Sequence, residues 1–165
     1  MSVDINSLPD LTEYDLLPEG VHPLCLRAVA EYFGRSQGCG TRSRLCNKLK
    51  QYVEEVQKGH WDAEVIIDGS FVMPAVDDPE DIDLILVLPP DWDMSAEVKP
   101  YEYNLISCRR TRKHYGFDVF AVRSGSAEEK EWLEFFQQVN VKWCEPLGIP
   151  PGTPKGIVRV AHDSE

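Results

Sequence analysis

Three aspartates are the residues of this chain best suited to hold a metal ion. Asp81 and Asp83 open the apolar run 81–88 (DIDLILVL), and Asp118 stands near the start of another, 117–122 (FDVFAV). Side chains alternate along a strand, so Asp81 and Asp83 would share one face. Two neighbouring carboxylates repel each other unless a cation lies between them, and Mg²⁺ prefers such hard oxygen ligands together with substrate phosphates. We therefore expect a Mg²⁺ site that Asp118 joins from an adjacent strand.

A glycine–serine pair precedes these aspartates by a short spacer. Gly69-Ser70 follows the β-branched run 64–67 (EVII), and ten residues separate Ser70 from Asp81. Glycine lets the backbone approach a phosphate closely, and exposed N–H groups with a serine hydroxyl can donate hydrogen bonds to its oxygens. The same pair is ordinary turn chemistry. Its place before the aspartates favours phosphate binding.

Basic residues gather at 109–113 (RRTRK), just before the strand that carries Asp118. The expected phosphate contacts of this basic island are Arg109, Arg110, Arg112 and Lys113. Arginine suits bidentate contact with phosphate, but the island could instead end a solvated helix and complement its dipole. Lys155 is a further candidate for phosphate contact. The acidic segment 77–80 (DDPE) reads as a solvated loop rather than as additional metal ligands.

The surrounding elements predict an α+β fold, a mixed sheet with flanking helices. Short apolar or β-branched runs predict strands at 64–67, 81–88, 117–122 and 157–160. Helical spacing of apolar residues predicts helices at 22–33, 41–58 and 127–139. Thr41 or Ser43 would cap the second helix and Gly59 would end it. The residues of the last helix expected to face inward are Trp132, Phe135, Phe136 and Val139.

The length of 165 residues fits a single domain. Its expected parts are an extended lead-in at 1–20, helices at 21–60, a catalytic sheet core at 61–125, and a C-terminal helix and tail at 126–165. The five cysteines are scattered and odd in number, which favours free thiols over a disulfide framework. Without an evident signal peptide or membrane-spanning run, we expect a cytoplasmic protein that does not bind membranes. The net charge of −11 argues against binding long nucleic acid.

The order of these motifs resembles the nucleotidyltransferase superfamily, which includes DNA polymerase β and the minimal nucleotidyltransferases. Its elements here are Gly69-Ser70, the Asp-hydrophobic-Asp-hydrophobic segment 81–84, and the lone Asp118. Asp68 departs from the pattern, because the family often has an apolar residue before the glycine. A narrower likeness links residues 18–22, 67–72 and 155–157 to an uncharacterised prokaryotic group of nucleotidyltransferase-like proteins, which brings no known substrate.

The resemblance implies an enzyme that transfers an NMP group from a nucleoside triphosphate, such as ATP, and releases pyrophosphate. Asp81, Asp83 and Asp118 would be the catalytic residues and would hold two Mg²⁺ ions, with Mn²⁺ able to replace them. Gly69 and Ser70 would bind the β- or γ-phosphate. The acceptor would be a hydroxyl or phosphate of a protein, a small molecule or an RNA end, and the acidic charge favours the first two.

Two other functions stay open at this point. The chain could be a nucleotide-binding or interaction module without catalysis, such as a component of a toxin–antitoxin or phage-defence system. It could also be a plain metal-binding domain, which would leave Gly69-Ser70 without a role. A domain of this size has little surface for both nucleotide and acceptor, so a second copy or a partner protein could complete the site.

Overall fold

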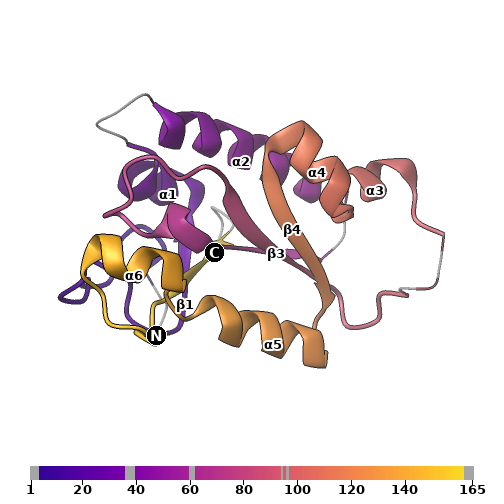
Figure 1. Cartoon of the computed structure of the whole chain (residues 1–165). Helices are drawn as coiled ribbons and strands as arrows, with labels where there is room; N and C mark the ends of the chain where they lie inside the picture. Colours follow the sequence, from indigo (N-terminus) through magenta and orange to yellow (C-terminus); the bar gives the residue numbers. More distant parts are fainter. Residues whose placement is uncertain (1–3, 36–39, 60–61, 94, 96, 162–165) are drawn as a thin grey trace.

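A five-stranded mixed sheet forms the centre of the computed structural model, which describes residues 4–35, 40–59, 62–93, 95 and 97–161 (Figure 1). The strands are β1 (Val21–Cys25), β2 (Glu64–Asp68), β3 (Ile82–Leu88), β4 (Phe117–Arg123) and β5 (Ile157–Ala161). Their order across the sheet is β1-β5-β2-β3-β4. β1 is parallel to β5 and β3 to β4, whereas β2 runs antiparallel to both of its neighbours. The expected α+β fold with a mixed sheet is confirmed.

Helices lie on both faces of this sheet. They are α1 (Leu26–Phe33), α2 (Thr41–Lys58), α3 (Pro100–Ile106), α4 (Cys108–Tyr115), α5 (Ala127–Phe136) and α6 (Val141–Leu147), with a 3₁₀ turn, η1 (Gly69–Val72). Figure 1 shows α2, α3 and α4 along one face and α5 along the opposite face. Different helices therefore cover the two faces of the sheet.

The alternation of side chains along β3 divides them between the two faces. Ile82, Leu84, Leu86 and Leu88 are fully buried in the core that α1 and α2 cover. Ile85 and Val87 point to the other face, where they cluster with Phe136 of α5. Asp83 is two residues before Ile85 and therefore lies on the same face as this second set. The strand pattern thus places its carboxylate on the α5 face.

The predicted helix at 41–58 is confirmed as α2, with its apolar face buried. The buried residues of that face are Leu45, Leu49, Tyr52, Val53 and Val56. Gly59 ends the helix, as expected. The N-cap is Gly40, with a φ of +78°, rather than Thr41 or Ser43. Since Gly40 makes no side-chain bond, α2 begins without the hydroxyl cap that the sequence suggested.

The prediction of a helix at 22–33 is wrong for its first four residues, which belong to β1. These residues pair with β5, and only the part from Leu26 onward is helical. Pro23 lacks an N–H, which an edge strand tolerates. Pairing with β5, distant in sequence, overrides the local helical spacing. The sheet therefore extends beyond 61–125 at both ends, and 21–60 is not wholly helical.

The predicted helix at 127–139 ends earlier, at Phe136, and a separate helix α6 follows. Asn140 caps α6 by accepting a hydrogen bond from the N–H of Lys142. Phe135 was expected to face inward, but 61% of its surface is exposed. Trp132 and Phe136 stack on each other one helical turn apart, so the adjacent Phe135 falls outside the buried stripe. The helices α3, α4 and α6 were not predicted as separate elements.

The lead-in up to residue 20 contains turns but neither helix nor strand in its described part. It is nevertheless packed, because Leu16 and Leu17 are buried. The free thiols of the described residues are Cys25, Cys46, Cys108 and Cys144. Cys39, His60, Trp61 and His162 lie outside the described residues. None of the described helices is both long and apolar enough to cross a membrane.

Candidate metal centre

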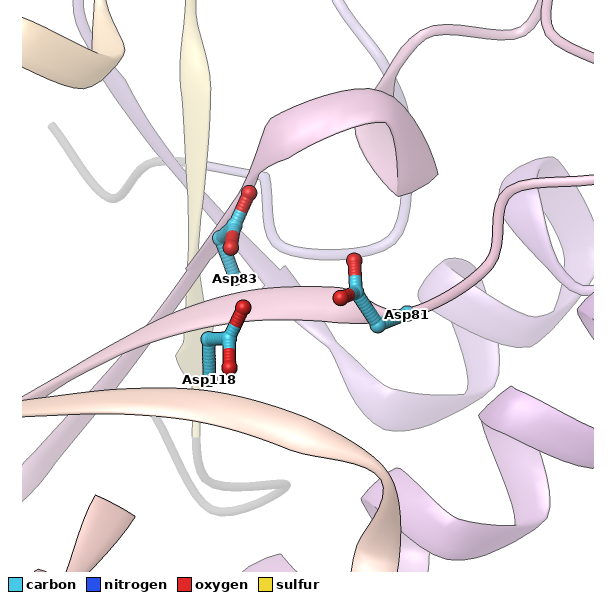
Figure 2. Close-up of side chains that lie close together, drawn as sticks. All are labelled: Asp81, Asp83 and Asp118. Atoms are coloured by element: carbon cyan, nitrogen blue, oxygen red, sulfur yellow. The ribbon is translucent and has the colours of Figure 1, made fainter. Parts of the chain in front are cut away.

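Strand pairing brings the three predicted aspartates together. β3 and β4 run parallel, and Asp83 pairs with Asp118 in their register. Asp81 directly precedes β3. One carboxylate oxygen from each of the three residues lies within 4.8 Å of the others, and Figure 2 shows the side chains lying close together. The juxtaposition expected from the sequence is present in the structure.

The glycine–serine turn lies directly against one of these carboxylates. Gly69 has a φ of +78°, a conformation that residues with a side chain rarely adopt. A β-carbon at this position would collide with the carboxylate of Asp83. Position 69 therefore needs glycine both for its backbone conformation and for the close approach of Asp83.

A buried arginine fixes the segment that follows the turn. The guanidinium of Arg42, at the start of α2, donates five hydrogen bonds of 2.6–3.1 Å to backbone carbonyl oxygens. Their acceptors are Phe33, Phe71, Met73 and Val76. Burial lowers the pKa of Arg42, while the nearby carboxylates of Asp77 and Asp78 oppose that shift. This gives the acidic segment 77–80 a structural partner. Sequence reasoning missed Arg42, which carries no motif.

The carboxylates of the site repel one another in a partly dehydrated environment. Burial raises the pKa of Asp83 to about 6, and the charges of Asp81 and Asp118 add to the rise. Burial is also the main cause that raises the pKa of Asp81, followed by the charge of Asp118. Lys155 and Lys142 oppose the shift at Asp83. The aspartates thus form a site that a cation would stabilise.

Arg112 is the residue of the basic island that reaches the aspartates. It extends from α4, and both its Nε and an Nη atom donate to the same carboxylate oxygen of Asp118, the Nε at 2.8 Å. Arg110 and Lys113 line a separate hollow beside α2 and α3, and Arg110 also lies over the ring of Tyr103. Arg109 is exposed. The structure therefore brings one of the four expected phosphate contacts to the site and leaves three elsewhere.

A buried pair of opposite charges lies beside the aspartates. Asp68, at the end of β2, pairs with Asp83 in the antiparallel register, and its side chain is fully buried. Burial raises the pKa of Asp68 well above its usual value, and the charge of Lys155 opposes this shift. Burial lowers the pKa of Lys155 to about 8, and Asp68 and Asp83 oppose that change. Asp68, which departs from the family pattern, thus has the buried Lys155 as its counter-charge.

A cleft of about 380 Å³ lies between the sheet and the α5–α6 connection. Its polar side contains Gly69, Ser70, Asp81, Asp83 and Lys155. Its opposite side has an apolar character and contains Phe135, Val141 and Trp143, with Lys142 among them. Val141 is 73% exposed. Sequence reasoning missed this apolar side, because helical spacing only sorts residues into buried and exposed positions and does not show which of them line a cleft.

The donor set fits a hard divalent cation. Three carboxylates in mutual reach match the oxygen ligands that Mg²⁺ and Mn²⁺ take. This is the one such group of metal-ligating side chains within the described residues, and it includes neither the histidine nor the cysteine that zinc favours. The geometry supports divalent-cation binding and leaves the identity of the cation a prediction.

The comparisons with known proteins give a family but no activity. No curated protein and no solved structure matches the chain. A family described only as a family of unknown function, DUF6932, matches residues 9–161. The matched region includes all five strands, the three aspartates and Lys155. The chain therefore belongs to the family of unknown function DUF6932.

Proposed function

We propose that this protein is a Mg²⁺-dependent nucleotidyltransferase. It would move an NMP group from a nucleoside triphosphate to a hydroxyl or phosphate of a protein, a small molecule or an RNA end, with release of pyrophosphate. The observation that carries the proposal is the grouping of Asp81, Asp83 and Asp118 within 4.8 Å, at the start of two adjacent strands and beside the Gly69-Ser70 turn. The order and spacing of the same residues carry the resemblance to the nucleotidyltransferase superfamily.

Each residue has a role that follows from its chemistry. Asp81, Asp83 and Asp118 would hold the metal ions, whose positive charge stabilises the attacking and leaving oxygens of an in-line displacement. The backbone N–H groups at Gly69-Ser70 and the Ser70 hydroxyl would donate hydrogen bonds to phosphate oxygens. The carboxylate of Asp118 would also accept the proton of an attacking hydroxyl.

The two unlike sides of the cleft also support a nucleotide as ligand. A nucleotide carries a polyanionic tail and a flat, heteroaromatic base. The cleft offers Ser70, Lys155 and the metal-binding carboxylates on one side, and exposed apolar groups of Phe135 and Val141 on the other. Small-molecule sites combine such apolar lining with a few convergent polar groups.

One observation favours the alternative of a nucleotide-binding module without catalysis. Arg112 already neutralises Asp118 through two hydrogen bonds to one oxygen. A guanidinium in this position could take the place of one of the two cations that group transfer needs. Such a protein would bind nucleotide and a single metal ion but leave the triphosphate intact.

The proposal predicts that a nucleoside triphosphate with Mg²⁺ raises the melting temperature of the protein. We would compare each of the four ribonucleoside triphosphates with and without Mg²⁺ on the wild type, on Asp83→Asn and on Asp91→Asn. Asp91 is an exposed carboxylate outside the cleft, so its variant serves as the matched control. At a ligand concentration about 100 times Kd, binding stabilises the fold by about 2.7 kcal/mol. The shift should vanish in Asp83→Asn and persist in Asp91→Asn.

Transfer itself requires a second measurement. The protein would be incubated with the α-³²P-labelled form of the stabilising triphosphate and with cell extract, and labelled products would be separated by size. Appearance of labelled product together with pyrophosphate supports catalysis. Nucleotide binding without release of pyrophosphate under any condition selects the binding module, and absence of binding by all four triphosphates contradicts both functions.

A further inference from the structure

Lys155 is a buried cation without a hydrogen-bond partner. It is 3% exposed, and its Nζ finds no acceptor among the described residues. Both carboxylate oxygens of the neighbouring Asp68 also lack a donor there. Buried charges normally form hydrogen bonds, because desolvation is costly and is offset only by close partners. Two charged groups left in this state beside a cleft point to a function other than stability.

The backbone holds Lys155 firmly in its place. Its N–H donates to the carbonyl oxygen of Gln137 at 2.9 Å, and the N–H of Gly156 donates to that of Leu17 at 2.8 Å. Pro154 pairs with Gln138 in an isolated antiparallel bridge. These contacts fix the chain on both sides of Lys155, whose side chain lines the cleft together with Ser70 and Asp83.

We propose that Lys155 binds the phosphate tail of the nucleotide in the cleft. This inference rests on the proposed function and adds to it the group that recognises the tail. The basic island cannot supply that charge, because Arg110 and Lys113 line another hollow and Arg112 is bonded to Asp118. An ammonium with three free donors suits phosphate oxygens. Asp68 is then the buried counter-charge of the ammonium and does not itself contact the tail.

The competing explanation is that Lys155 serves only as the counter-charge of Asp68. In that case the two residues matter to the fold as a pair, and neither contacts the ligand. Removing one partner of a buried pair destabilises a protein strongly, whereas replacing both by neutral groups is often tolerated. This difference allows a test that separates ligand binding from stability.

The experiment compares Lys155→Met, Asp68→Asn and the double variant with the wild type. Urea unfolding measures stability, and calorimetric titration measures affinity for the stabilising triphosphate and for inorganic tripolyphosphate, each with Mg²⁺. Each single variant should lose stability, and the double variant should recover most of it. If Lys155 binds the tail, Lys155→Met and the double variant lose about tenfold or more in affinity for both probes. Asp68→Asn should keep its affinity within about threefold, because Asp68 does not contact the tail.

The outcomes separate this inference from the proposed function. A folded double variant that binds both probes like the wild type would show that Lys155 is only a counter-charge, while nucleotide binding itself would stand. Equal losses of affinity in the two single variants would have the same meaning, and this comparison holds even if the double variant does not fold. Failure of the wild type to bind any triphosphate would overturn both the inference and the proposed function.

Discussion

At the scale of single residues, the site places three carboxylates close enough to bind a cation and therefore close enough to repel one another. Asp83 touches Gly69, pairs with the buried Asp68 of the neighbouring strand β2, and lies close to Asp81 and Asp118. Its charged form is therefore disfavoured in the metal-free protein, where burial and like charges raise its pKa to about 6. Such surroundings are typical of functional sites, which makes Asp83 a candidate functional residue.

These surroundings predict that Asp83→Asn stabilises the metal-free protein at neutral pH. The pKa of Asp83 rises from 3.8 to about 6 on folding, so the folded chain binds an additional proton between these values. The resulting stabilisation is fully present below pH 3.8 and is lost as the pH rises through about 6. The uncharged asparagine removes that loss and should stabilise the fold at neutral pH by on the order of 1–3 kcal/mol.

Urea unfolding at about pH 5 and about pH 7.5, with a chelator present, checks this expectation. Asp91→Asn is again the control and should leave the free energy of unfolding nearly unchanged. The advantage of Asp83→Asn should grow with pH and should shrink when Mg²⁺ is added. An asparagine variant that is less stable than the wild type at the higher pH would contradict the electrostatic description of the site.

At the scale of elements, the cleft depends on a loop that an arginine holds in place. The segment from Phe71 to Val76 joins the glycine–serine turn to the approach of β3, and it contains three of the four carbonyl acceptors of Arg42. The fourth acceptor, Phe33, ends α1. One side chain thus links two helices to the loop between β2 and β3.

Arg42→Met is expected to destabilise the protein by about 3–5 kcal/mol, because it leaves buried carbonyl oxygens without donors. The matched control is Arg44→Met, since Arg44 is an exposed arginine on the same helix. Its effect should stay within about 0.5 kcal/mol. Urea unfolding of both variants measures the difference, and equal stabilities would show that the hydrogen bonds of Arg42 contribute little.

The sequence predicted those elements whose residues carry a strong local pattern. Strand β3 is a continuous apolar run apart from Asp83, and α2 repeats its apolar residues at helical intervals, so both were recognised close to their true bounds. β1 was not, because the helical spacing of the residues from Leu26 onward was extended to residues 22–25, which form a strand by pairing with β5. The helices α3 and α6 contain seven residues each, too few for a periodic signal.

In the candidate site, too, the sequence predicted what depends on local pattern and missed what depends on contacts between distant segments. Asp81, Asp83 and Asp118 were found because residue type and strand phase determine where they point. The pairing of Asp68 with Lys155 joins positions far apart in the chain, and no spacing rule connects them. Arg112 was chosen for phosphate, yet the fold directs it to Asp118. Side-chain partners across the sheet depend on topology, which the local pattern does not contain.

At the scale of the whole molecule, the net charge of −11 opposes contact with nucleic acid. The basic island that could compensate is divided, because Arg112 is bonded to Asp118 and Glu54 and Glu55 lie in the same hollow as Arg110 and Lys113. We therefore predict that a labelled single-stranded RNA of about 30 nucleotides binds with a Kd weaker than about 10⁻⁴ M at about 0.15 M salt. Fluorescence anisotropy would measure it, and tight binding that falls steeply with salt would refute the prediction.

The position of β5 has a consequence for how the protein is made. β5 lies between β1 and β2, although it is the last of the five strands along the chain. On the ribosome, an emerging chain that already carries all three aspartates cannot yet join β1 to the rest of the sheet. Lys155 leaves the exit tunnel immediately ahead of β5. The nascent protein therefore gains Lys155 just before β5 completes the sheet. Translation products that end before residue 155 lack both Lys155 and β5.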